Sequence, residues 1–104
     1  MRERRITKND FYKNEIIIDF YYCELQDFTN VLKNNYIGFM SGVYGWNCDI
    51  YEINMQGLHI YLSEGYRPIN KNKNKIMPEK EIRELIYKFL KQKQEEIKYR
   101  NEEY

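Results

Sequence analysis

The sequence predicts one α+β domain with the order β-α-β-β-β-α: a small, mostly antiparallel sheet of three or four strands, a short first helix and a long C-terminal helix. Three observations carry this prediction: a β-branched and aromatic run at 15–22, two alternating segments around Gly57, and an amphipathic stripe after Pro78. A chain of 104 residues suits a single core spanning residues 1–104. Two helices are too few for a doubly wound sheet, so we expect both on one face.

The first strand and the first helix follow from the spacing of apolar residues. In the segment EIIIDFYY at 15–22, Ile16, Ile18 and Phe20 share one face, which is typical of a largely buried strand. In the segment 24–33, Leu25, Phe28 and Leu32 recur at spacings of three and four, which predicts a short helix that ends at Asn34-Asn35.

The next part of the chain predicts three strands. A second strand is expected at 36–40, and Gly38, Gly42 and Gly45 indicate bulges, tight bends or a close backbone approach there. The segments 46–54 and 58–63 read as the arms of a hairpin, because apolar and polar residues alternate in the second arm and Gly57 lies in the turn.

A basic loop at 67–77 separates the sheet from the C-terminal helix, which is expected at 78–101. Pro78 suits the first helical turn, and Glu79 and Glu81 complement the positive end of the helix dipole. Beyond Leu90 only Ile97 continues the apolar stripe, so the last turns project into solvent, fray, or meet a partner. One partner that this helix allows is a second copy of the chain, paired through Leu85, Phe89 and Ile97.

Charge is segregated along the chain, although the net charge is only +1. The N-terminal segment 1–13 and the loop 67–77 are basic, whereas residues 15–66 hold seven acidic residues and only Lys33 as a basic one. The chain has eleven tyrosines, and seven of them lie in this acidic part. The tyrosine excess has two readings: codon bias in an AT-rich genome, or a surface used in contact, to which tyrosine is well suited.

Several classes of protein are disfavoured by the residues. No apolar run reaches the roughly 20 residues of a membrane span, and no signal-type segment follows the charged start, so we expect a cytoplasmic protein that makes no membrane contact. Cys23, Cys48 and His59 are too few for structural zinc, and both cysteines are expected to be reduced and mostly buried. We expect no cofactor, no metal and no enzymatic activity. A small hydrolase requires carboxylates to converge on metal ions, and the available ones are Asp19, Glu24, Asp49, Glu52 and Glu64.

Three short motifs carry a resemblance to a protein family. They are Tyr22-Cys-Glu-Leu-Gln26, Gly42-Val-Tyr-Gly-Trp-Asn-Cys-Asp-Ile-Tyr51 and Gly65-Tyr-Arg-Pro68. Across about residues 16–97 the chain resembles small, mostly uncharacterised proteins encoded on phages, plasmids and integrative elements of Gram-positive bacteria. Some proteins of this genetic setting are anti-CRISPR inhibitors. The resemblance therefore implies a non-enzymatic inhibitor whose partner is a CRISPR effector protein or its guide complex.

Aromatic and acidic residues around the predicted hairpin form the candidate partner-binding site. Two alternatives without a partner stay open for these residues: a structural corner that locks the hairpin onto the first strand, and an ordinary solvated acidic face. The alternative function is a small DNA- or RNA-binding regulator that uses the basic segments 2–13 and 67–80. The candidate site comprises Tyr44, Trp46, Asp49, Tyr51, Glu52, Glu64, Tyr66 and Arg67.

Overall fold

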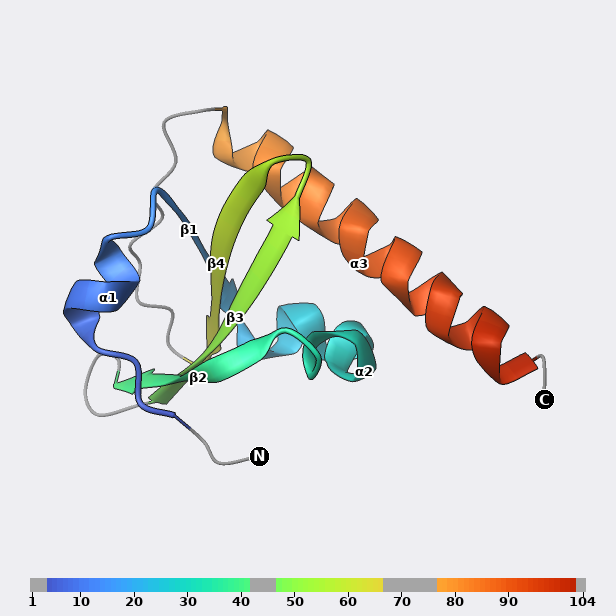
Figure 1. Ribbon diagram of the computed structural model, residues 1–104, viewed down its shortest axis with the longest axis horizontal. Helices are drawn as coiled ribbons and strands as arrows, with labels where there is room; N and C mark the ends of the chain where they lie inside the picture. Colours follow the sequence, from blue (N-terminus) through green and yellow to red (C-terminus); the bar gives the residue numbers. More distant parts are fainter. Residues whose placement is uncertain (1–3, 42–46, 67–76, 103–104) are drawn as a thin grey trace.

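The computed structural model describes residues 4–41, 47–66 and 77–102 as one α+β unit around a four-stranded sheet. Figure 1 shows the sheet with the long helix α3 on one side and the short helix α1 on the other. The elements in chain order are α1 (Lys8–Tyr12), β1 (Ile16–Tyr21), the 3₁₀ helix η1 (Tyr22–Phe28), α2 (Thr29–Leu32), β2 (Tyr36–Ser41), β3 (Asn47–Met55), β4 (Leu58–Gly65) and α3 (Glu79–Glu102). The predicted fold class is confirmed, and α1 is an addition to it.

The sheet has the strand order β1-β4-β3-β2 and is mixed. Strands β2, β3 and β4 are consecutive and antiparallel, and the tight turn between β3 and β4 has positive φ at Gln56 (48°) and Gly57 (77°). Two positive φ values in succession are the geometry of a two-residue hairpin loop, which confirms the predicted role of Gly57. Strand β1 pairs in parallel with β4, in the register from Ile16↔Ile60 to Tyr21↔Gly65.

Both faces of the sheet are covered. The larger core lies between the sheet and η1, α2 and α3, and includes Ile18, Phe20, Leu62 and Ile86. The opposite face carries a smaller cluster in which Ile6 and Phe11 from the N-terminal residues pack on Ile17, Met40, Cys48 and Ile50 of the sheet. The two predicted helices lie on one face, as expected, whereas α1, which was not predicted, supplies a buried aromatic residue to the second face.

The N-terminal segment also extends the sheet at its β2 edge. The backbone N–H of Ile6 donates to the carbonyl oxygen of Phe39, and the N–H of Phe39 donates to that of Arg4, both at 2.7 Å. Gly38 makes this pairing possible, since its φ is +148° and an added Cβ would overlap the Arg4 carbonyl oxygen. A register shift lies beside it, between Tyr36 and Gly38. The close backbone approach expected in this region is confirmed at Gly38, while Gly42 and Gly45 lie outside the described residues.

The first predicted helix is divided into two types of helix. Residues 22–28 form a 3₁₀ helix, and only the four residues of α2 are α-helical. Leu25 and Phe28 of η1 are buried, and their spacing of three matches the three residues per turn of a 3₁₀ helix. These turns thus place both side chains in the core.

Helix α3 crosses the larger core and continues beyond it (Figure 1). Ile82, Ile86 and Leu90 are fully buried at intervals of four residues, as expected for one amphipathic face. The helix runs without interruption to Glu102. Its later turns are held to the neighbouring helices by half-buried Ile97 and by Gln94, whose side-chain N–H donates to the Asp27 carbonyl oxygen at 2.9 Å.

Arg83 fastens α3 to the outer strand of the sheet. Its Nη2 donates to the carbonyl oxygen of Asp19 at 2.6 Å, and its guanidinium carbon lies 4.5 Å from the centroid of the Phe20 ring. Glu24 and Glu79 lie within 3.8 Å and 3.7 Å of the same guanidinium. Side chains that form hydrogen bonds with the backbone groups of an edge strand also protect that edge from pairing with another chain.

We predict that Gly38→Ala destabilises the protein by about 3 kcal/mol or more, because the new Cβ meets a backbone carbonyl and the positive φ is strained. Urea unfolding measures this loss, and amide exchange of Ile6 and Phe39 reports whether the N-terminal segment leaves β2. Gly57→Ala is the matched control: its φ is also positive, but nothing lies within 4 Å of the added Cβ, so a loss of only about 1 kcal/mol is expected. Equal losses for the two variants would contradict the close-approach explanation.

Candidate functional site

Three strand ends meet at one end of the sheet. Because β1 and β4 are parallel, their carboxyl ends lie side by side at Tyr21 and Gly65, and the first residues of antiparallel β3 reach the same end. Asp49 on β3 stands directly opposite Glu64 on β4. Tyr22 and Tyr66 are the residues that follow β1 and β4. Acidic and aromatic side chains from distant parts of the sequence thereby come together.

A pocket of about 360 Å³ opens at this end, between the sheet and the η1–α2 segment. The sheet contributes two carboxylates and a tyrosine, and the helical segment contributes an aromatic ring and polar side chains. The lining residues are Tyr22, Gln26, Thr29, Leu32, Asp49, Tyr51 and Glu64.

Glu64 is the buried acid of this pocket. It is only 8% exposed, and its Oε1 accepts a hydrogen bond of 3.4 Å from the hydroxyl of Tyr51. Burial, together with the negative charge of Asp49, raises the pKa of Glu64 to about 7, and the Tyr51 hydrogen bond opposes the rise. The pKa of the Tyr51 hydroxyl is also raised, first by burial and then by the charge of Glu64. Glu64 therefore changes its protonation state near neutral pH.

Exposed tyrosines form the rim of the pocket. The rings of Tyr22 and Tyr66 are stacked, with centroids 4.9 Å apart and an interplanar angle of 16°. Tyr22 and Tyr66 are 49% and 64% exposed, which leaves much of both large rings accessible to a partner. Tyr21 is also exposed, but it follows Phe20 on β1, so its side chain points to the other face of the sheet. We name Tyr22 and Tyr66, with Asp49, Tyr51 and Glu64, the acidic tyrosine surface.

The structure brings together part of the predicted site. Asp49, Tyr51, Glu64 and Tyr66 all belong to the acidic tyrosine surface, whereas Tyr44, Trp46 and Arg67 lie outside the described residues. Glu52 is separated from the other acids, because neighbouring residues of a strand point to opposite faces of a sheet. Its carboxylate lies 3.0 Å from Nε2 of His59, on the face covered by α1.

Three contributors from η1 and α2 were not predicted: Tyr22, Gln26 and Thr29. The sequence signal for Tyr22 and Gln26 was their place in one of the motifs of the resemblance. What the motif did not reveal is that parallel pairing of β1 with β4 would put Tyr22 beside Tyr66.

A second buried polar group lies on the other face of the sheet. The hydroxyl of Ser63 donates to Oδ1 of Asp19 at 2.6 Å, and both side chains are buried.

Burial and the nearby acids raise the pKa of the Cys48 thiol to about 11, so this cysteine is inert at neutral pH. Cys23 is exposed, contrary to the expectation of mostly buried thiols.

The carboxylates considered for hydrolysis do not converge. Asp19 faces the smaller core, Asp49 and Glu64 face the larger one, and Glu24 is an exposed residue of η1 that accepts from the backbone N–H of Tyr21. Among residues 4–41, 47–66 and 77–102, no group of three or more His, Cys, Asp or Glu side chains is arranged to hold a metal ion.

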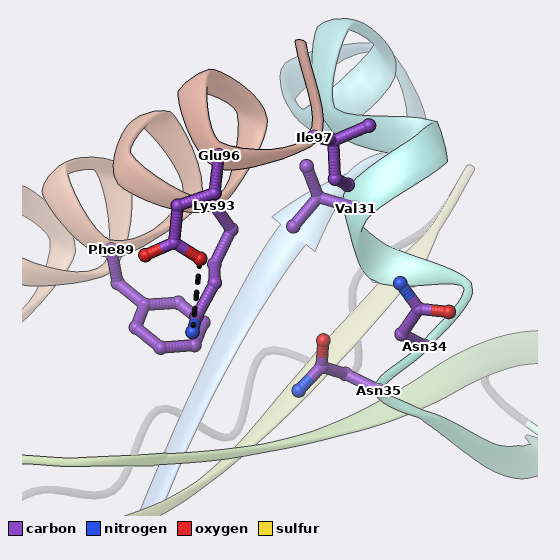
Figure 2. Close-up of a pocket in the computed structure, with 7 residues that line it drawn as sticks. All are labelled: Val31, Asn34, Asn35, Phe89, Lys93, Glu96 and Ile97. Carbon is purple, nitrogen blue, oxygen red and sulfur yellow. Dashed lines mark ion pairs between the residues drawn. The ribbon is translucent and has the colours of Figure 1, made fainter. Parts of the chain in front are cut away.

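Figure 2 shows another pocket, of about 260 Å³, between α2 and the later turns of α3. Val31, Phe89 and Ile97 supply apolar walls, and Lys93 and Glu96 form an ion pair of 3.5 Å at its mouth. The side-chain N–H of Asn35 is already engaged with the Glu52 carbonyl oxygen, at 3.0 Å. Phe89 and Ile97, which were considered for pairing with a second copy, pack in part against the chain's own core, as does Leu85.

Comparison of the chain with known protein families, with curated proteins and with solved structures finds no match. Within the described part of the chain, no helix is long and apolar enough to cross a membrane.

We predict that the protein loses stability as the pH rises from about 4.5 to about 7. In this range the unfolded chain has an ionised Glu64, whereas the folded chain keeps the proton because its pKa is raised. A shift of this size corresponds to at most about 3 kcal/mol. Urea unfolding at pH 5 and pH 8 measures the difference. Glu64→Gln, which carries no charge at either pH, should remove most of this dependence and be more stable than the parent at pH 8. An unchanged pH dependence in that variant would contradict the assignment to Glu64.

Proposed function

We propose that the chain is a non-enzymatic inhibitor that binds another protein through the acidic tyrosine surface. The observation that carries the proposal is a stacked pair of exposed tyrosines, Tyr22 and Tyr66, at a pocket that is lined by two carboxylates. Aromatic side chains supply contact energy in interfaces at small entropic cost, and opposite charges steer the encounter. The surface therefore suits a partner whose own site is basic.

A groove that holds nucleic acid is such a basic site. Lysines and arginines line it in order to neutralise phosphates, and a protein with suitably placed acids competes for the same cations. The sequence supports this reading, since residues 15–66 hold seven acidic residues against one lysine. The resemblance described above narrows the proposed partner to a CRISPR effector nuclease or its guide complex.

The competing function, direct binding of DNA or RNA, requires basic residues near the aromatic ones. Arg4, Arg5, Lys8 and Lys13 are exposed, but they belong to the segment that packs on the smaller core. The stacked tyrosines lie instead beside Asp49 and Glu64, whose charges repel a polyanion. The arrangement therefore favours a protein partner over nucleic acid.

Capture of partners from a lysate of a Gram-positive bacterium with a CRISPR system, washed at moderate salt, tests the proposal. We expect an effector protein or its guide complex to be retained, and the purified effector then to be inhibited. The double change Tyr22→Ala and Tyr66→Ala should weaken the interaction at least about tenfold, because it removes the exposed rings. Tyr99→Ala removes an equally exposed ring from α3 and should have little effect.

The charge contribution has its own matched pair. Asp49→Asn should weaken binding, whereas Glu52→Gln alters the same charge on the opposite face and should leave it unchanged. Retention of nucleic acid alone, with a mobility shift of free DNA at low salt that disappears when Lys8 and Lys13 are changed, would overturn the proposal and support the competing function.

A further inference from the structure

The pocket of the acidic tyrosine surface holds a carboxylate whose surroundings within the described chain are incomplete. Glu64 is more than nine-tenths buried and lines the cavity. Its hydrogen bond from Tyr51 is long, at 3.4 Å, against the roughly 2.5–3.0 Å usual for hydroxyl donors. The ion pairs formed by residues 4–41, 47–66 and 77–102 involve Glu24, Glu52, Glu79 and Glu96 but not Glu64. A buried carboxylate normally has a cation or several donors.

The pairing of the strands adds to this electrostatic strain. Asp49 stands directly opposite Glu64, and opposed side chains of neighbouring antiparallel strands lie roughly 4.5–5.5 Å apart at Cβ. The charge of Asp49 disfavours the ionised form of Glu64, and a cation placed beside Glu64 offsets that cost. The cavity is the place from which such a cation reaches both acids.

The remaining walls suit a planar organic cation. Tyr22 and Tyr51 provide aromatic rings, over which a guanidinium packs favourably, and the Gln26 amide and Thr29 hydroxyl provide further oxygen atoms. At about 360 Å³ the pocket lies at the small end of the roughly 300–1,000 Å³ range of ligand sites, which fits one side chain rather than a cofactor. A guanidinium also presents several N–H groups in one plane, so that it bonds two carboxylates at once.

We propose that this pocket receives one arginine side chain of the partner protein, with its guanidinium between Glu64 and Asp49. The inference rests on the proposed function and specifies its partner: a protein with a protruding arginine in its basic site. Among residues 4–41, 47–66 and 77–102, the groups that line the pocket with Glu64 are Asp49 and Tyr51 from β3 and Tyr22, Gln26 and Thr29 from η1 and α2, and none of these is a cation. Binding therefore requires an ionised Glu64 and strengthens as the pH rises through about 7.

The test uses N-acetyl-arginine amide as a probe and N-acetyl-citrulline amide as a neutral control of nearly the same shape. Two-dimensional NMR of the whole chain follows the backbone amides during each titration. We expect saturable shifts around the pocket with the arginine probe, at least about tenfold weaker binding in Glu64→Gln, and at least about fivefold weaker binding at pH 5.5 than at pH 8. Glu52→Gln is the control for a charge change on the other face and should bind as the parent does.

Several outcomes would overturn the inference: equal shifts with the citrulline probe, no saturable shift with the arginine probe, or equal affinity in Glu64→Gln and the parent. Arg67→Ala provides a further check, since binding that appears only in this variant would assign the pocket to the chain's own arginine. The two proposals fail separately. If a captured partner binds the parent and Glu64→Gln equally, the inference fails and the proposed function stands. If the arginine probe binds the pocket but no protein partner is captured, the proposed function fails and the inference stands.

Discussion

The parallel pairing of β1 with β4 is the constraint on which the rest of the structure depends. Because the two strands run in the same direction, η1 starts at the end of the sheet where β4 finishes. Tyr22 consequently stacks on Tyr66, although the 43 residues between them along the chain include the strands β2, β3 and β4. Antiparallel pairing would have sent Tyr22 to the opposite end of β4. The pocket would then have lost its aromatic wall and its η1 side.

The same pairing leaves β1 at the edge of the sheet, and the fold protects that edge with side chains. Arg83 of α3 donates a hydrogen bond to the Asp19 carbonyl oxygen, and Glu24 of η1 accepts one from the Tyr21 N–H. At the opposite edge, backbone groups of Arg4 and Ile6 pair with Phe39 of β2. Both edges are thus engaged by other parts of the chain, which disfavours recognition through addition of a partner strand. Side chains at the end of the sheet remain as the available contact surface.

Local patterns in the sequence predicted the four strands and the long helix α3, but not α1 or the arrangement of the elements. Alternation around Gly57 predicted the hairpin, and the stripe of Ile82, Ile86 and Leu90 predicted α3, because both signals come from residues a few positions apart. Alternation along β3 also puts Asp49 and Glu52 on different faces of the sheet. The predicted site nevertheless included both, because it grouped residues by their place in the hairpin and not by the face on which they lie. Parallel pairing, and burial of Phe11 on the second face, depend on contacts distant in sequence, for which no local pattern exists.

The buried position of Glu64 is unfavourable for folding, and this makes sense as a property of a binding site. A glutamine there would avoid both the burial of a charge and the repulsion by Asp49, so stability alone does not explain the acid. A cation that enters the pocket lowers the pKa of Glu64 and recovers the free energy that its ionisation costs in the unliganded protein. Strain of this kind, held in the free state and released on binding, gives a preference for a charged partner over a neutral one of the same shape. The exposed tyrosines around the pocket have no such selectivity, so in this arrangement the rim contributes contact area and the buried acid contributes the discrimination.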